Sequence, residues 1–376
     1  MGVYQLPMMK RSIYITKVKI SKTEKKAVEK VFDSGMIAQG PKVAEFEKRF
    51  AKFCGAKYGV ATNSGTAALH CACYAVGIGA GDEVITTPFT FVASANAILM
   101  VGGKVVFTDI EEETFNIDPQ QIKRKISYKT KVIIPIDLFG HPYDYSAVKK
   151  IIKKKKILIV EDACQAVGAK YKGYQAGMLG DIGCFSFYAT KNMLTGEGGM
   201  LVTNNQNFAE KAKMLRHHGQ SEKKRYQYFD LGYNYRMTDF VAALGIEQLK
   251  KVERLNKQRI KNAQFYLKEL ANTKGLVLPK TKKGVKHVFH QFTMRITGDF
   301  KLNRDQFFDY LKEKGIYCGV YYPKPLHLHP HFQKMGYKKG DFPVAEKLAR
   351  EVISLPIHPY LTKSEMEYIV KTIKAI

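Results

Sequence analysis

Between residues 58 and 203, short runs rich in apolar and β-branched residues alternate with longer stretches of helical character. Runs of four or five such residues are typical of buried strands, and most of the stretches between them are long enough to hold a crossover helix. The alternation predicts an α/β fold, with a three-layer large domain around a mostly parallel seven-stranded sheet. The last two runs are joined by too short a segment for a helix, so their order and direction stay open. The seven runs are Tyr58–Ala61, Val84–Thr87, Val105–Thr108, Val132–Ile136, Ile157–Glu161, Gly183–Phe187 and Met200–Thr203.

The pattern changes after Thr238. A long helical and charged stretch follows, and strand-like runs return only at 289–296 and 317–322. Helices are expected at 304–314, 343–352 and 363–374, so we predict a smaller C-terminal α+β domain. The expected division is an N-terminal segment 1–35, a large domain 36–250 and a small domain 251–376, with the boundary inside a long helix. Near the N-terminus, Ser21 and Glu24 match a capping box at the start of a helix.

Composition is that of a globular chain without a membrane anchor. Of its 376 residues, 45% are hydrophobic, which is normal for a globular protein. The apolar runs are well short of the ~20 residues that a membrane helix requires. Charged residues recur from Lys10 onward, and the first 30 residues contain no apolar stretch like that of a signal peptide. We therefore expect a cytoplasmic protein.

Neither the cysteines nor the histidines form a pattern typical of a metal site. The six cysteines include no Cys-x-x-Cys pair and most lie in apolar surroundings, so we interpret them as reduced core residues. His327, His329 and His331 alternate around Pro330, with no cysteine or carboxylate ligand nearby. We expect no metal.

The net charge is strongly positive. Lys and Arg number 61 and Asp and Glu 34, which gives +27. A field of this sign attracts nucleic acid, an anionic membrane surface or a small phosphorylated substrate. The densest lysine run, within 149–156, flanks a strand-like run and suits a solvated helix end. No RNA-binding signature with interleaved aromatic residues is present, so we expect neither nucleic acid nor membrane as a partner.

Two polar residues that follow apolar runs carry the most specific chemical signal. Asp162 follows the run 157–161, and Lys191 lies between the run 183–187 and the glycine-rich segment 196–199. A carboxylate at the end of a buried strand is costly unless it is paired. Pyridoxal phosphate (PLP) enzymes need a lysine that forms a Schiff base and a carboxylate that keeps the pyridine nitrogen protonated. A solvated lysine or a helix-capping acid explains either residue alone, but the two together predict a PLP site.

Further candidates follow neighbouring runs, where ligands of open α/β sheets bind. Gly65 and Thr66 open a helix, so their backbone N–H groups suit a phosphate, although they also suit an ordinary helix start. Phe91 can stack on a flat ring or belong to the core. Gln165 can donate a hydrogen bond to the phenolic oxygen of PLP.

Together these motifs resemble the DegT/DnrJ/EryC1/StrS aminotransferase family of PLP-dependent sugar aminotransferases. The resemblance covers nearly the whole chain, from Gly40 to Pro359. It implies the aspartate aminotransferase fold (fold type I) and a homodimer that shares its two active sites. The motifs that carry it are Asn63-Ser64-Gly65-Thr66-Ala67-Ala68-Leu69, Gly81-Asp82-Glu83-Val84-Ile85, Glu161-Asp162-Ala163-Cys164-Gln165, Phe185-Ser186-Phe187-Tyr188-Ala189-Thr190-Lys191, Gly196-Glu197-Gly198-Gly199 and Gly232-Tyr233-Asn234-Tyr235-Arg236.

The resemblance also implies roles for individual residues. Lys191 is expected to hold PLP as a Schiff base and later to move protons, while Asp162 pairs with the ring nitrogen. Gln165 is expected near the phenolic oxygen and Phe91 against the ring. The expected phosphate contacts are Gly65, Thr66, Ser186 and the partner subunit's Asn234.

The implied reaction is a ping-pong transfer of an amino group from an amino acid, expected to be L-glutamate, to a nucleotide-diphosphate-linked keto sugar. Arg236, Tyr322 and His327 are the candidates for contacts with the sugar. A sister group of sugar dehydratases replaces the lysine with histidine, so Lys191 favours transamination. A dehydratase of the same fold stays as the alternative, and a basic nucleic-acid-binding protein without activity is a second one.

Overall fold

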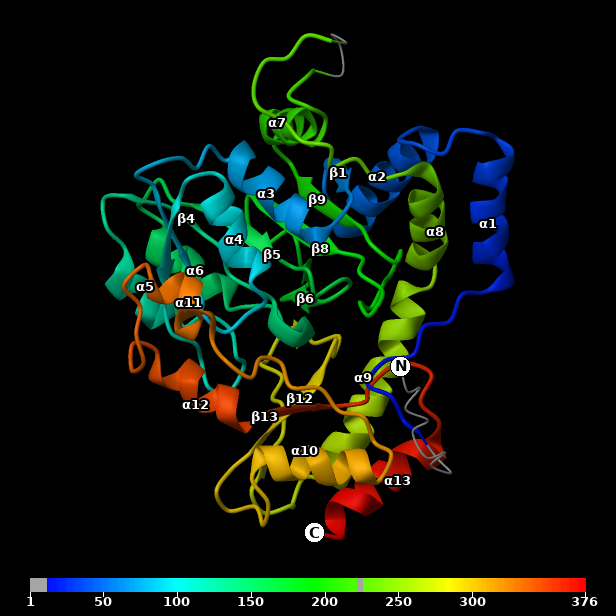
Figure 1. The fold of residues 1–376 in the computed structure, drawn as a ribbon, viewed down its shortest axis with the longest axis vertical. Coiled ribbons are helices and arrows are strands. Elements are labelled where there is room, and N and C mark those ends of the chain that lie inside the picture. The colour runs from blue at the N-terminus through cyan, green and yellow to red at the C-terminus, as the bar shows by residue number, and fades with distance from the viewer. Residues whose placement is uncertain (1–11, 222–225) are drawn as a thin grey trace, which may run out of the picture.

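A seven-stranded sheet forms the centre of the larger part of the molecule in the computed structural model, which describes residues 12–221 and 226–376 (Figure 1). Six strands run in one direction, and only β9 is antiparallel to its neighbours, β1 and β8. The α/β class predicted from the sequence is confirmed. The order across the sheet is β1 (Tyr58–Thr62), β9 (Gly199–Thr203), β8 (Ile182–Ser186), β5 (Leu158–Asp162), β4 (Thr130–Ile133), β2 (Glu83–Thr86) and β3 (Lys104–Phe107).

The direction of β9 follows from the short connection that precedes it. Parallel neighbours are usually connected by a crossover helix, whereas residues 187–198 between β8 and β9 contain turns, bends and an isolated bridge from Tyr188 to Gly196 but no helix. The chain therefore returns antiparallel, with Ser186 opposite Gly199. Lys191 lies on this connection, next to the end of β8.

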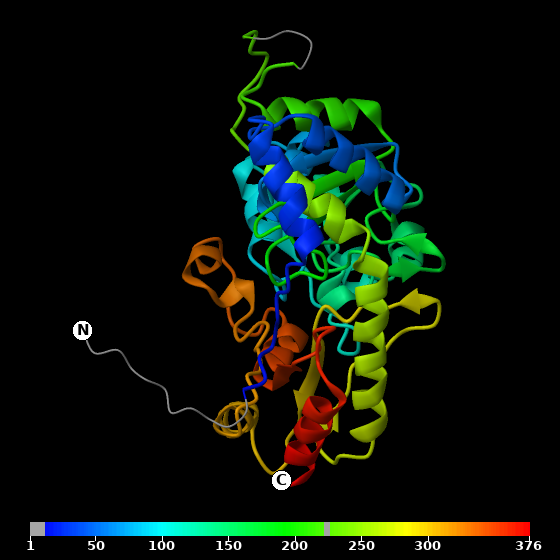
Figure 2. The ribbon, with the colours of Figure 1, turned by 90° about the vertical axis from the view of Figure 1, so that its right-hand side faces the viewer.

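Helices cover both faces of the sheet, because successive strand residues point to opposite sides. Val60 and Leu201 pack into the core beneath one helical layer, whereas Ala61 and Met200 pack into the core on the other face. The three-layer arrangement is visible in Figures 1 and 2. The first layer contains α3 (Gly65–Ala75), α4 (Ala93–Met100) and α7 (Gln206–Arg216); the second contains α2 (Pro41–Cys54), α5 (Pro119–Lys125), α6 (Tyr145–Ile152) and α8 (Asp239–Leu249).

The N-terminal segment is divided between the two parts of the molecule. Helix α1 (Lys22–Asp33) begins with the predicted capping box at Ser21 and packs on α8. The chain ahead of it runs down to the C-terminal part (Figure 2), where Ile13 N donates to Gly315 O at 2.8 Å and Tyr14 stacks on Tyr317. The first eleven residues of the segment predicted over 1–35 lie outside the described residues.

A second, three-stranded antiparallel sheet organises the C-terminal part. Its strands are β10 (Leu276–Val277), β12 (Phe292–Ile296) and β13 (Val352–Leu355), and its core is shared with α9 (Val252–Glu269), α10 (Arg304–Glu313) and α13 (Lys363–Lys374). The long helical stretch predicted after Thr238 is two helices, α8 and α9, separated at Lys250 and Lys251. A small sheet of β6 (Lys170–Tyr171), β7 (Tyr174–Gln175) and β11 (Val285–Lys286) joins the two parts.

The strand predicted at 317–322 is wrong. Only Gly319 pairs, with Ser354 of β13, through hydrogen bonds of 3.0 and 2.7 Å. The chain then leaves the sheet, and Tyr321 and Tyr322 turn toward the cavity described below. Two aromatic residues with high strand propensity therefore form part of the cavity wall and not of the sheet.

Part of the C-terminal region packs back on the large sheet. The short segments η2 (Leu326–Leu328) and α11 (Pro330–Gln333) and helix α12 (Pro343–Glu351) share the core of α3 and α4. Phe332 packs edge-on against Phe107 at the end of β3, with ring centroids 5.2 Å apart. Among the described residues, no helix has both the length and the apolar character needed to cross a bilayer.

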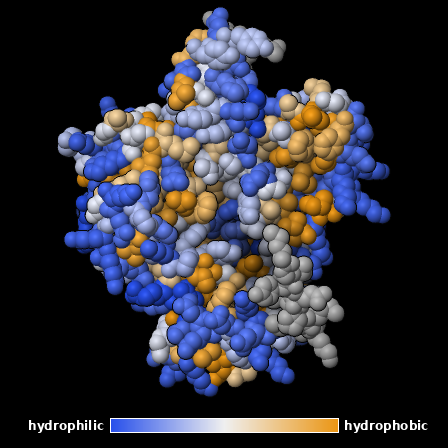
Figure 3. All heavy atoms as spheres, in the orientation of Figure 1, coloured by the Kyte–Doolittle hydropathy of each residue, from blue (hydrophilic) through white to orange (hydrophobic). Residues whose placement is uncertain are grey.

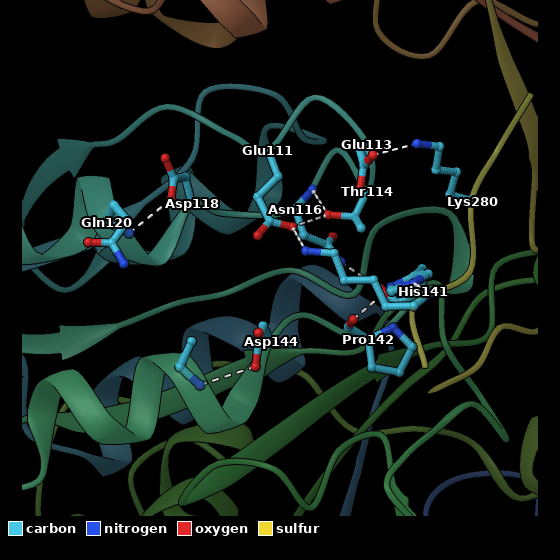
Figure 4. Close-up of polar contacts among 12 residues, drawn as sticks. Glu111, Glu113, Thr114, Asn116, Asp118, Gln120, His141, Pro142, Asp144 and Lys280 are labelled. Atoms are coloured by element: carbon cyan, nitrogen blue, oxygen red, sulfur yellow. Dashed lines mark hydrogen bonds and ion pairs between the residues drawn. The ribbon is translucent and has the colours of Figure 1, made fainter. Parts of the chain in front are cut away.

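The loops after β3 and β4 are tied together by polar contacts (Figure 4). Asn116 Nδ2 donates to His141 O at 2.8 Å, and its Oδ1 accepts from Leu138 N at 3.0 Å. Lys280 reaches across from the C-terminal part to pair with Glu113. These contacts hold the turn η1 (Leu138–Gly140), whose Phe139 lines the cavity.

Candidate active site

A cavity of about 790 Å³ lies at the carboxyl ends of the parallel strands. This is the edge at which open α/β sheets bind ligands. The loops after β1, β2, β5 and β8 supply most of its wall, and residues of the C-terminal part close the other side. The lining residues are Asn63, Ser64, Gly65, Thr66, Leu69, Thr90, Phe91, Ala93, Ser94, Phe139, Asp162, Cys164, Gln165, Ser186, Tyr188, Thr190, Lys191, Glu197, His290, Gln291, Tyr321 and Tyr322.

The start of α3 forms an anion site on one wall of the cavity. Ser64 is the N-cap residue, and its hydroxyl accepts from Ala67 N at 3.1 Å. Gly65 and Thr66 are the first two helical residues, so their N–H groups lie outside the helix's own hydrogen bonds and are available to a ligand. A Cβ placed on Gly65 would lie 2.7 Å from Ser186 Cβ, so the glycine allows the helix start to approach the end of β8.

Asp162 presents a fixed carboxylate at the end of β5. The residue is only 5% exposed, and both oxygens are held: Oδ2 accepts from Ser94 Oγ at 2.6 Å and Oδ1 accepts from Cys164 N at 3.1 Å. These two hydrogen bonds fix the orientation of the carboxylate. The arrangement suits a cationic ring N–H in the cavity.

A second buried acid lies behind Asp162 on the other face of β5. Glu161 accepts from Gly177 N at 2.7 Å and from Leu179 N at 2.8 Å, and Asp137 lies beside it. Burial, together with the neighbouring Glu161 carboxylate, raises the pKa of Asp137 well above its ordinary value. The pair therefore keeps a proton on Asp137 in the folded protein.

Lys191 lies in the cavity with Asp162. Its backbone N–H donates to Tyr188 O at 2.8 Å, which closes a turn after β8. Burial lowers the pKa of the Lys191 amine, and Cys164 and Asp162 partly offset this effect. A lowered pKa increases the fraction of neutral amine, which is the nucleophilic form.

Gln165 and Tyr322 form a polar pair in the cavity wall. Gln165 Oε1 accepts from Phe139 N at 2.9 Å, so its amide oxygen is identified and its Nε2 is the donor end. That Nε2 donates to Tyr322 Oη at 3.3 Å. Phe91, predicted to face a ring, lines the same cavity and is 57% exposed.

Three predicted site residues lie outside this cavity. Arg236 contacts the His217 ring, and the side chain of Asn234 is exposed on the loop before α8. His327 is fully buried and its Nε2 pairs with Glu346 at 2.9 Å, which argues against the predicted contact with a sugar. The structure thus places Tyr322 in the cavity but not Arg236 or His327.

Sequence reasoning missed several lining residues. Ser94 follows Phe91 on the segment after β2, and a hydroxyl in that position is a signal that could have been found. Tyr321, His290 and Gln291 come from the C-terminal part, more than 80 positions beyond Lys191 in the sequence. The sequence around these three residues contains no motif that indicates a place in the same cavity as Lys191.

Comparisons with known proteins agree with this geometry. The sequence profile of the DegT/DnrJ/EryC1/StrS aminotransferase family matches residues 18–374. GDP-perosamine synthase of Caulobacter vibrioides is 36% identical over 89% of this chain and 90% of its own length. The dTDP-3-amino-3,4,6-trideoxy-alpha-D-glucose transaminase of Streptomyces venezuelae is 35% identical over 93% of this chain and 90% of its own.

Solved structures give the same result. S. venezuelae DesV, crystallised with a ketimine intermediate, superimposes with a TM-score of 0.89 at 34% identity and covers 94% of this chain and 93% of its own. Streptococcus pneumoniae Spr1654 in its PLP form reaches a TM-score of 0.92 at 30% identity, with 97% and 98% covered. The fold is therefore that of fold type I aminotransferases, as predicted. The chain belongs to the DegT/DnrJ/EryC1/StrS aminotransferase family and is a transaminase.

Proposed function

We propose that this transaminase uses PLP to move an amino group from an amino acid, expected to be L-glutamate, to a keto sugar carried on a nucleotide diphosphate. One observation carries the proposal: a lysine of lowered pKa, a fixed carboxylate and the open start of a helix line one cavity. These are the three groups that a phosphorylated pyridine aldehyde requires.

The residues present fit PLP. Its phosphate dianion suits the N–H groups of Gly65 and Thr66, together with the hydroxyl of Ser186, because all three donate and the helix start carries partial positive charge. Asp162 suits the pyridinium N–H, and the donor end of Gln165 suits the phenolic oxygen. When bound, PLP supplies the electron sink that makes the α-carbon of an amino acid acidic.

Lys191 has two tasks in this proposal. Its Nζ would hold the cofactor covalently in the resting enzyme, and its lowered pKa favours the neutral amine that forms this bond. Once released by the incoming amino acid, the same Nζ removes the proton from the donor's α-carbon. Phe91, Tyr188 and Tyr321 line the cavity in which this transfer would take place.

The amino acceptor is inferred from the relatives and from charge. The names of three relatives contain GDP, dTDP and UDP sugars, so the nucleotide varies while the diphosphate is common to all three. A net charge of +27 attracts such an anion. We expect kcat/KM for the nucleotide sugar to fall as ionic strength rises, and an unchanged value would refute this steering.

The proposal includes a homodimer with shared active sites. Asn234 is exposed and does not line the cavity of its own chain, so it is free to reach the phosphate site of a second copy. Apolar side chains gather over the region of α1, α2 and α8 (Figure 3), including the exposed Phe32, Met36 and Ile37. Patches of this kind mark interaction surfaces. A monomeric mass by light scattering, or unchanged PLP affinity in Asn234→Ala, would contradict the shared site.

A direct test follows both products. Purified protein with PLP, L-glutamate and a panel of GDP-, dTDP- and UDP-linked keto sugars is expected to form one 2-oxoglutarate for each amino sugar, as ping-pong transfer requires. A keto sugar consumed without 2-oxoglutarate would contradict amino transfer and favour dehydration. Lys191→Ala is the matched inactive control.

A further inference from the structure

His290 is a buried histidine in the cavity that the proposed chemistry does not use. It lies between β11 and β12 in the C-terminal part and is only 6% exposed, yet it lines the same cavity as Lys191. Its Nδ1 lies 3.2 Å from Asn192 Oδ1, on the residue that follows Lys191. A histidine is thus bonded to the segment that carries the reactive lysine.

Two buried asparagines determine which atom of this contact carries the hydrogen. Asn256 Nδ2 donates to Val167 O at 2.8 Å, and Asn192 Nδ2 donates to both Asn256 Oδ1 at 2.8 Å and Val288 O at 3.2 Å. Backbone carbonyls only accept, so both amide orientations are fixed. Asn192 Oδ1 is therefore an acceptor, and His290 Nδ1 must carry the hydrogen.

The imidazole stays neutral in this environment. Burial lowers the pKa of His290 well below its ordinary value, and the nearby Lys191 and Arg259 lower it further. A neutral ring protonated at Nδ1 has a lone pair on Nε2. Within residues 12–221 and 226–376, Nε2 accepts no hydrogen bond, and the ring borders the cavity.

We propose that His290 Nε2 accepts a hydrogen bond from a hydroxyl of the keto sugar, and that Asn192 and Asn256 position it for this task. The inference rests on the proposed function and assigns a residue to the acceptor half of the reaction. The lone pair of a neutral imidazole accepts from O–H groups but repels carboxylates and phosphates, so it suits a sugar hydroxyl and not the carboxylates of the amino acid or the diphosphate. His290 is therefore a specificity residue of the sugar half-reaction.

The kinetic test separates the two half-reactions in His290→Phe and His290→Gln. In stopped flow, His290→Phe is expected to leave the glutamate half-reaction within about twofold of wild type. Its kcat/KM for the fastest GDP-, dTDP- or UDP-linked keto sugar should fall about 10- to 100-fold, because a sugar hydroxyl loses its partner. His290→Gln, which restores an acceptor oxygen, should recover most of that loss. Equal slowing of both half-reactions would show that His290 acts through Lys191 and would overturn the inference. A sugar half-reaction in His290→Phe as fast as in the wild type would overturn it as well.

A second readout needs no sugar. Nitrogen-15 NMR of the holoenzyme labelled at histidine, with His290→Gln to assign the signal, should show a neutral ring protonated at Nδ1. Asn192→Ala should shift the ring toward protonation at Nε2. A wild-type ring protonated at Nε2 would overturn the proposal. If the wild-type enzyme aminates no sugar of the panel, both the proposed function and the role of His290 are wrong. If the wild type aminates a sugar and His290→Phe does so equally well, only the role of His290 is wrong.

Discussion

Gly65→Ala tests how closely the phosphate site is built. The added Cβ would lie 2.7 Å from Ser186 Cβ and 3.2 Å from both Ser186 Oγ and Cys164 Sγ. Carbon atoms pack best at roughly 3.5–4.0 Å, so Ser186 or the start of α3 must move by about 1 Å. Ser186 is paired with Gly199 in the sheet, and this pairing resists the movement.

Two effects follow from that crowding. Overpacking a close contact costs about 1–3 kcal/mol of folding stability. Displacing the Ser186 hydroxyl removes one hydrogen bond to a charged phosphate, a contact worth about 1.5–3 kcal/mol. Since about 1.4 kcal/mol is tenfold in affinity, we expect Gly65→Ala to bind PLP about 10- to 100-fold more weakly.

Urea unfolding followed by circular dichroism gives the stability, and absorbance titration gives the PLP dissociation constant. Gly79→Ala is the matched control, because a Cβ on Gly79 meets nothing within 4 Å. The control should unfold and bind PLP like the wild type. Equal stability and equal PLP affinity in Gly65→Ala and Gly79→Ala would refute a close contact between Gly65 and Ser186.

Two further substitutions test the acids of β5. Ser94→Ala removes the hydroxyl that donates to Asp162, so we expect about tenfold lower kcat with PLP still bound; unchanged kcat would show that Ser94 does not support the carboxylate. Asp137 has a raised pKa in the folded state, so folding takes up a proton. The stability that this protonated Asp137 contributes is present at low pH and is lost as the pH rises above about 4, the ordinary pKa of an aspartate. Asp137→Asn keeps a donor toward Glu161 and should flatten the dependence of the urea midpoint on pH above about 4. A variant as pH-dependent as the wild type would assign that dependence to other groups.

Local sequence pattern was enough to predict the sheet and the strand-end residues. Each of the seven predicted runs agrees with a strand of the sheet to within three residues at either end, because short buried apolar runs between helical stretches leave few alternatives. Asp162 and Ser186 end strands, so the geometry of a parallel sheet brings them to one edge. Periodicity could not give the direction of β9, which depends on the length of a single connection.

Long-range packing explains what sequence could not predict. The run 317–322 has strand propensity, but Tyr321 and Tyr322 are used as cavity wall. His327 was predicted to contact the sugar, yet its ring is buried against Phe342 and hydrogen-bonded to Glu346. Whether a residue of the C-terminal part faces the cavity depends on how the two parts meet, and a single sequence contains no local signal for that.

The central claim is that Lys191 binds PLP and that the bound cofactor accepts an amino group. The most direct measurement is the absorbance spectrum of the protein with PLP, before and after excess L-glutamate, for the wild type and Lys191→Ala. The account predicts a wild-type band near ~410–420 nm from the lysine Schiff base that moves to ~330 nm with glutamate, and no such band in the variant. A Schiff-base band that persists in Lys191→Ala, or no band in the wild type, would contradict it.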